Sequence, residues 1–187
     1  MNSRALQAGF TRRQLLKGGL WSAVGIVAGG WLAVRLTDVS PGASAPLKYL
    51  GAAEQLMFAK LADAILSDVL PAEADAHQQW LGWITQNVDA AINLLPLALQ
   101  RETKKLTSML TFAPTRTLLT GQWTGWAKVE RAELQAHLEA MRQSDNNTRL
   151  TVYRVVHDLV MAGFYGDRRS WPLIGYSGPV YDNPKNG

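Results

Sequence analysis

Apolar side chains recur every three or four residues along most of residues 51–164, and this spacing constrains the fold more than any other feature. Its clearest stretch has apolar or small residues at Val152, Val155, Val156, Leu159, Val160 and Gly163. Such a period places these residues on one face of an α-helix. Strands would instead show strict alternation, and no alternating stretch of convincing length occurs. The sequence therefore predicts an all-α fold, a small bundle of about five helices.

Prolines and turn residues divide this pattern into segments. Pro96 and Pro114 mark two of the breaks, because proline removes a backbone donor and disrupts a helix interior. Leu56 and Val69 fall on the apolar stripe of the first segment, and Asp75 is the expected N-cap of the second. We expect helices over residues 51–69, about 80–95, 97–112, 129–142 and 148–164, with a short helix and a turn within 115–126. The segment 148–164 has the most apolar face, which predicts that it lies at the centre of the bundle.

The first 45 residues have a different organisation. Arg12 and Arg13 stand together, Leu15, Leu16 and Lys17 follow, and residues 18–34 contain no charge. This order is typical of a twin-arginine export signal, which directs the transport of folded proteins. An ordinary signal peptide or a membrane anchor is the alternative. Five glycines make residues 18–34 less hydrophobic than a dedicated membrane span, which favours the export signal.

A linker rich in Ser, Pro, Gly and Ala joins this segment to the rest of the chain, so we divide the protein into residues 1–45 and a helical domain over 46–187. Ala43, Ser44 and Ala45 form the small-x-small pattern of a cleavage site. Pro46 directly after it is a poor fit to cleavage, since its fixed φ disturbs the extended backbone that a peptidase holds. Cleavage near residues 42–47 and retention of the segment both remain open.

Charge and cysteine content limit the chemistry of the helical domain. The whole chain has a net charge of +4, but five of its 19 basic residues precede the first acidic one, Asp38. The rest of the chain has 14 basic and 15 acidic residues, so we do not expect a nucleic-acid-binding surface. The absence of cysteine excludes disulfides and iron–sulfur clusters bound by this chain. The flavin fingerprint Gly-x-Gly-x-x-Gly is also missing.

Catalytic and metal-binding patterns are not apparent. The three histidines, His77, His137 and His157, are far apart and lack the spacing of a zinc site, so we interpret each as a surface or polar helix residue. His157 and Asp158 are neighbours, and helix geometry points adjacent side chains about 100° apart, so we do not expect a catalytic pair. Asp63 has no second carboxylate, nucleophile or base at a sequence spacing typical of a catalytic site. We therefore assign no catalytic, cofactor-binding or metal-binding residue to this chain.

The C-terminal residues 164–187 combine helix breakers with aromatic side chains. Disordered tails are poor in aromatic residues, so we expect an ordered, irregular segment docked on a protein surface. It wraps over its own bundle or lies against another protein, and the sequence leaves both open. If the segment lies against another protein, its rigid aromatic residues would make good anchors at the interface. The residues that we predict to dock a partner are Phe164, Tyr165, Trp171, Pro172, Ile174, Gly175, Tyr176, Gly178 and Pro179.

These features together resemble a known family. The twin-arginine leader, the helical body and the sequence from Phe164-Tyr165-Gly166-Asp167 through Ser170-Trp171-Pro172 to Ile174-Gly175-Tyr176-Ser177-Gly178-Pro179 are similar to the gluconate 2-dehydrogenase subunit 3 family. The resemblance is close over residues 164–179 and loose over the rest of the helical domain. Members of this family are small subunits, without cofactor, of periplasmic, membrane-associated dehydrogenases.

The resemblance implies a partner and a role. In this family the large subunit is an FAD-dependent oxidoreductase of the glucose–methanol–choline type, often joined by a cytochrome c subunit that carries haem. The large subunit is exported folded on the signal of the small one. The chain would then be a non-catalytic subunit that meets the twin-arginine translocase, carries its partner to the periplasm and stabilises it. The alternatives are a freestanding periplasmic enzyme or ligand-binding protein, and a general chaperone for another exported enzyme.

Overall fold

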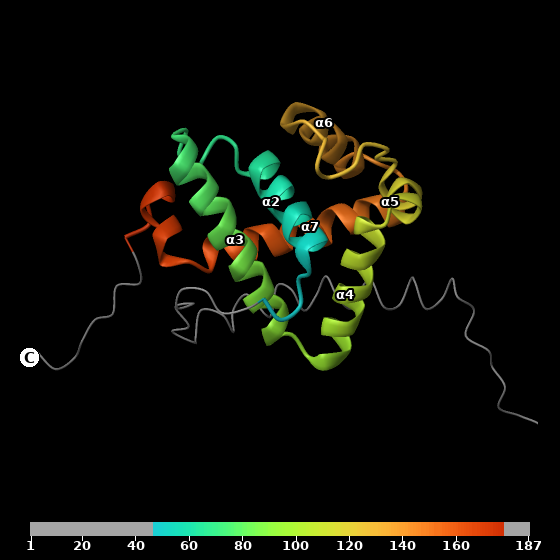
Figure 1. Cartoon of the computed structure of the whole chain (residues 1–187), viewed down its shortest axis with the longest axis horizontal. Coiled ribbons are helices and arrows are strands. Elements are labelled where there is room, and N and C mark those ends of the chain that lie inside the picture. Colours follow the sequence, from blue (N-terminus) through green and yellow to red (C-terminus); the bar gives the residue numbers. More distant parts are fainter. Residues whose placement is uncertain (1–46, 178–187) are drawn as a thin grey trace, which may run out of the picture.

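The computed structural model describes residues 47–177, in which all regular structure is helical (Figure 1). This confirms the predicted all-α fold and the ordered, irregular segment at its C-terminal end. The six α-helices and two 3₁₀ helices of this part are α2 (Ala52–Ile65), α3 (Ala74–Leu94), α4 (Leu97–Thr111), α5 (Ala113–Thr120), α6 (Arg131–Arg142), α7 (Asn147–Tyr165), η1 (Arg168–Ser170) and η2 (Pro172–Ile174).

Helix α7 is the centre of the bundle, as its apolar face predicts. It packs against α2, α3, α5 and α6, and Figure 1 shows it crossing behind the other helices. Asn146 caps its first turn, because the side-chain oxygen accepts hydrogen bonds from the backbone N–H groups of Thr148 and Arg149. Val152, Val156 and Val160 of this helix are among the most deeply buried residues of the domain.

Helix α7 packs closely against α3 at Gly163. A Cβ atom at this position would lie 2.8 Å from the backbone oxygen of Ile84 and 2.8 Å from the Cγ2 atom of Val88. Both distances are shorter than a normal van der Waals contact, so only glycine fits without movement of the helices. The place of Gly163 on the apolar face of α7 is therefore a packing requirement.

The first described residues are clamped onto the bundle by Asp89 of α3. Its carboxylate accepts hydrogen bonds from the backbone N–H groups of Lys48 (2.9 Å), Tyr49 (2.8 Å) and Leu50 (2.8 Å). The hydroxyl of Tyr49 donates to Gln100, and the Lys104 ammonium donates to the Tyr49 backbone oxygen. The chain thus enters the fold along α3 and α4, at the lower end of the bundle in Figure 1.

Three predictions about the first helices were wrong. Helix α2 ends at Ile65, and Leu66 and Leu70 bury their side chains from the turn that follows it, which leaves Val69 exposed. Leu56 is also exposed, although the helical spacing placed it on the apolar stripe. The N-cap of α3 is Glu73, whose carboxylate accepts from the N–H groups of Asp75 and Ala76. Asp75 lies inside the first turn.

Helix α3 begins at Ala74, before the expected start near residue 80, and the other segment boundaries lie close to the expected ones. Pro114 separates α4 from α5 but lies in the first turn of α5, where a proline is tolerated because its missing N–H has no helical partner.

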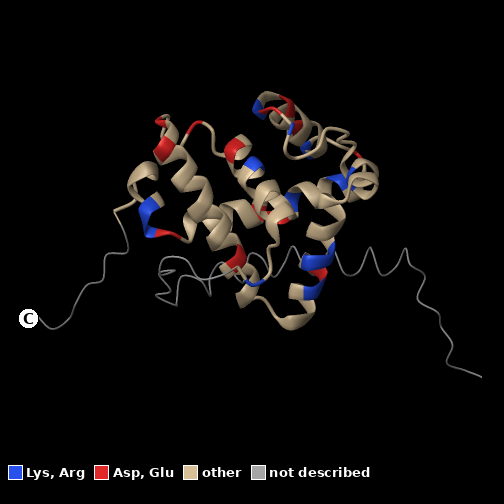
Figure 2. Ribbon diagram, in the orientation of Figure 1, with Lys and Arg blue, Asp and Glu red and all other residues tan. Residues whose placement is uncertain are grey.

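Lys and Arg are interspersed with Asp and Glu over the described helices (Figure 2). Among these helices, none is long and apolar enough to span a membrane. The predicted signal residues Arg12, Arg13, Leu15, Leu16 and Lys17 lie outside the described part.

Candidate partner-docking site

The C-terminal segment is attached to the bundle through Asp167. We call residues 166–177 the tail. The side-chain amide of Asn87 on α3 donates one hydrogen bond to the backbone oxygen of Gly163 (2.9 Å) and one to Oδ2 of Asp167 (3.2 Å). Asp167 also caps η1, since Oδ1 accepts from the backbone N–H of Arg169 (2.9 Å). One buried amide thus joins α3, the end of α7 and the start of the tail.

Arg169 adds a second attachment. Its Nε atom lies 2.8 Å from Oδ1 and 3.0 Å from Oδ2 of Asp167, and its guanidinium lies 3.9 Å from the ring centroid of Trp83 on α3. Burial by itself would raise the pKa of Asp167. The hydrogen bonds from Arg169 and Asn87 outweigh this effect, so the pKa of Asp167 is lowered and the carboxylate stays ionised.

Beyond Ser170 the tail forms a compact loop. Ser170 is fully buried, and its hydroxyl donates to the backbone oxygen of Asp167 at 2.7 Å. The backbone oxygen of Trp171 accepts from the N–H groups of Ile174 (3.2 Å) and Tyr176 (2.9 Å), while Gly175 has a φ of 71°. This left-handed conformation favours glycine and lets the chain reverse so that Tyr176 returns to Trp171.

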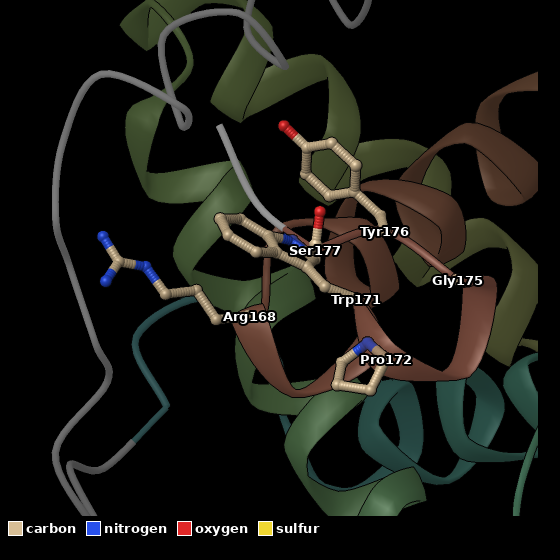
Figure 3. Close-up of a pocket in the computed structure, with 6 residues that line it drawn as sticks. All are labelled: Arg168, Trp171, Pro172, Gly175, Tyr176 and Ser177. Atoms are coloured by element: carbon tan, nitrogen blue, oxygen red, sulfur yellow. The ribbon is translucent and has the colours of Figure 1, made fainter. Parts of the chain in front are cut away.

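The loop surrounds a shallow hollow of about 330 Å³. The rings of Trp171 and Tyr176 meet edge to face, with centroids 5.2 Å apart, and Figure 3 shows both standing on one side of the loop. The Arg168 guanidinium lies 5.8 Å from the Trp171 ring centroid. The hollow is mostly apolar, and its lining consists of Arg168, Trp171, Pro172, Gly175, Tyr176 and Ser177.

The structure divides the predicted docking residues into three groups. Phe164 is only 1% exposed and packs against Trp80 and Tyr165, so it belongs to the core of this chain. Tyr165 is partly buried and also packs against the core. Trp171, Pro172, Gly175 and Tyr176 come together around the hollow, and Ile174 lies on the outside of the loop with 42% of its surface exposed. Gly178 and Pro179 lie outside the described residues.

Sequence reasoning missed the residues that hold the tail in place. Asn87 and Trp83 lie about 80 residues before Asp167 in the chain, so no local pattern indicates their pairing with the tail. Leu173 was also missed, although it is as exposed as Ile174. The only local signal was Asp167 two residues before Arg169, because an aspartate at this spacing commonly caps a helical turn.

A second polar cluster surrounds His77, which is a polar residue of α3, one of the two interpretations that the sequence allows. Its ring is mostly buried, with Nδ1 2.9 Å from the Pro71 backbone oxygen and Nε2 2.7 Å from Oδ1 of Asp63. Arg131 of α6 binds the same carboxylate, with Nη2 2.7 Å from Oδ1. Burial would raise the pKa of Asp63, but the hydrogen bonds from Arg131 and His77 outweigh it and lower that pKa. The cluster connects α2, α3 and α6.

This cluster is poorly suited to acid–base catalysis, because both ring nitrogens of His77 and both oxygens of Asp63 already have partners in the fold. His157 and Asp158 lie closer together than helix geometry suggested, with Nδ1 3.4 Å from Oδ1, but this distance is long for a hydrogen bond. Within residues 47–177, no group of three or more histidine and carboxylate side chains is arranged to hold a metal ion.

Comparison of the chain with protein-family models, with curated proteins and with solved structures gives no match.

Proposed function

We propose that this chain is a non-catalytic carrier and assembly subunit. It binds a folded FAD-dependent dehydrogenase of the glucose–methanol–choline type through the tail, provides the twin-arginine signal for export of the complex, and stabilises the partner in the periplasm. The flavin belongs to the partner, and the haem c of any cytochrome subunit belongs to that subunit. This chain binds neither cofactor and performs no chemistry.

The observation that carries the proposal is an exposed apolar surface held in a fixed conformation. Asn87, Arg169 and Trp83 fix the start of the tail on the bundle. Its outer turn nevertheless exposes the side chains of Leu173 and Ile174 to solvent, in the same loop as Trp171. A rigid apolar surface binds with little loss of conformational entropy, and aromatic residues are enriched at the centres of protein interfaces. These properties fit a site for another protein.

The choice of partner rests on the sequence. The twin-arginine pattern at Arg12 and Arg13 suits a cargo that acquires its cofactor before export, and this chain has neither cysteine nor a flavin fingerprint of its own. The motif from Phe164 to Pro179 resembles the small subunits of flavin-dependent dehydrogenases. Together these features support a flavoprotein partner over a catalytic role for the chain itself.

The proposal is tested by purifying the tagged full-length chain from its native cells and identifying bound proteins by mass spectrometry. We expect a flavin-containing oxidoreductase to co-purify with the wild-type chain. Ile174→Asp places a charge in the docking surface and should remove this partner. Leu118→Asp is the control, because Leu118 is 79% exposed on α5, away from the tail. Retention of the partner by Ile174→Asp would contradict docking through the tail.

The carrier role has a separate readout in the same cells. Replacing Arg12 and Arg13 together by lysine should lower the amount of partner in the periplasm, because the partner has no other signal in this proposal. Normal export of the partner would contradict it. Turnover of a sugar or alcohol with an electron acceptor by the purified chain alone would identify a freestanding enzyme instead.

A further inference from the structure

Two exposed leucines flank the connection between α3 and α4. Leu94 is 45% exposed at the end of α3, and Leu97 is 70% exposed at the start of α4. The connection is held rigidly, since the Gln100 side-chain amide donates to the backbone oxygens of Asn93 (2.9 Å) and Leu95 (2.8 Å). Both leucines are therefore presented to solvent by a fixed turn.

Basic side chains surround these leucines. Arg101 and Lys105 are exposed one and two turns after Leu97, at a spacing of four residues that puts them on the same side of α4. Lys48 is exposed as well, and its ammonium lies 3.0 Å from Oδ1 of Asn93, next to Leu94. Figure 2 shows basic residues along α4. We call Lys48, Leu94, Leu97, Arg101 and Lys105 the α3–α4 surface.

Acidic side chains offset little of this charge. Glu102 is the one exposed acidic residue on α4. Asp89 of α3 is buried, and its oxygens accept from three backbone N–H groups. The α3–α4 surface thus combines apolar tips with a net positive charge, which is the chemistry of protein segments that lie on anionic bilayers.

The position at which the preceding chain joins the fold points to the same occupant. The 46 residues before Leu47 contain the uncharged stretch 18–34 and connect to the bundle at Lys48, which contacts Asn93 directly. A membrane contact made by those residues would keep the α3–α4 surface within reach of the lipid. Twelve residues separate position 34 from Leu47, a reach of at most about 40 Å.

We propose that the α3–α4 surface rests on an anionic lipid bilayer, with Leu94 and Leu97 inserted at the interface and Lys48, Arg101 and Lys105 facing lipid phosphates. This inference goes beyond the carrier role and does not depend on it. The tail lies on another side of the bundle (Figure 1), so the surface can meet a membrane while the tail binds a protein.

A second copy of this chain fits the surface less well. A symmetric dimer would bring the same patch together from both copies, and Lys48, Arg101 and Lys105 would then face their own equivalents. Stable protein interfaces also bury roughly 800 Å² on each partner, far more than two leucines supply. Insertion into a lipid interface needs only a small apolar area when basic residues surround it.

The chain contains no cysteine, so a single introduced thiol reports on one position. Leu97→Cys in the full-length chain is labelled with a polarity-sensitive nitrobenzoxadiazole fluorophore. It is mixed with vesicles of phosphatidylcholine alone or of phosphatidylcholine with phosphatidylglycerol. We expect severalfold higher emission with the anionic vesicles and quenching by nitroxide-bearing lipids. Leu118→Cys, also highly exposed but on α5, is the matched control and should stay unchanged.

Removing basic side chains from the α3–α4 surface tests the proposal independently. Arg101→Gln with Lys105→Gln should reduce binding of the Leu97 label to anionic vesicles by about fivefold for each charge removed. Lys128→Gln with Arg154→Gln removes two exposed charges elsewhere and should leave the signal intact.

Three results would overturn the proposal. In the first, the emission of the Leu97 label stays at its value in water although the chain co-floats with the vesicles. In the second, the chain does not bind anionic vesicles. A rise in emission with protein concentration in the absence of lipid would instead assign the surface to contact between copies of the chain.

Discussion

At the scale of single residues, the fold depends on Gly163 and Asp89, which look unremarkable in the sequence. Gly163 lets the backbones of α3 and α7 approach each other, and Asp89 satisfies three backbone donors of the entering chain. Neither contribution follows from residue type. Each depends on atoms that lie far away along the chain and close in space.

Replacing Gly163 by alanine should destabilise the protein by about 1–3 kcal/mol, the usual cost of overpacking a core. The new Cβ would meet the backbone oxygen of Ile84, which cannot move without moving α3. Gly82→Ala is the matched control, because a Cβ there has open space and alanine favours the helix by up to about 1 kcal/mol. Urea unfolding followed by tryptophan fluorescence measures both. Effects of the same sign would contradict this explanation.

Asp89→Asn should lower the free energy of unfolding by about 2–4 kcal/mol, since hydrogen bonds to a charged group contribute about 1.5–3 kcal/mol each and the amide replaces one acceptor by a donor. Hydrogen exchange at Lys48, Tyr49 and Leu50 should accelerate selectively. Asp145→Asn, at an exposed position, is the control and should change neither quantity. Unchanged exchange at residues 48–50 in Asp89→Asn would show that another contact holds the entering chain.

At the scale of elements, the tail is the part whose position depends most on electrostatics. Its two 3₁₀ turns are too short to be stable alone, so the contacts of Asp167 with Asn87 and Arg169 decide where the tail lies. Because the pKa of Asp167 is lowered in the folded protein, its ionised form contributes stability above the unfolded pKa of about 3.9. This contribution is lost as the pH falls through the lower folded value.

A spin label at Ile174→Cys should therefore be immobile at neutral pH and become mobile only well below the ordinary aspartate pKa of about 3.9, as the pH falls through the lowered pKa of Asp167. Asp167→Asn should make the label mobile across the whole range, because the neutral amide cannot pair with Arg169. Asp158→Asn alters a partly exposed carboxylate on α7 and should leave the label immobile at neutral pH. An immobile label in Asp167→Asn would mean that Ser170 and Trp83 hold the tail without the ion pair.

At the scale of the whole molecule, the two apolar surfaces to which we assign partners lie in different places. The tail exposes Leu173 and Ile174, and the α3–α4 connection exposes Leu94 and Leu97 near the position where the preceding chain enters. Figure 1 places the tail beside α3 and the connection at the lower end of the bundle. This separation allows a protein partner and a membrane to be bound at once, which suits a subunit that carries another protein.

The helical architecture was largely predictable because it depends on a local period. The spacing of Val152, Val156 and Val160 predicts both the helix and its buried face, and the structure confirms them. Helix ends were less predictable: Glu73 caps α3 where Asp75 was expected, since capping depends on the backbone conformation of one residue. The pairing of His77 with Asp63 was missed because the turn after α2, which the sequence does not specify in detail, brings them together.

By itself, the sequence determined the all-α fold and the central place of the last helix, because periodicity and proline positions are local properties. Only the tertiary structure decided which side chains of the tail are available. Phe164 lies four residues after Val160 on the buried face of α7, so its burial follows the helical period, but Ile174 turns outward because Asn87, distant in the chain, fixes Asp167 on α3. Contacts between distant residues set that geometry, and no local pattern in the sequence encodes them.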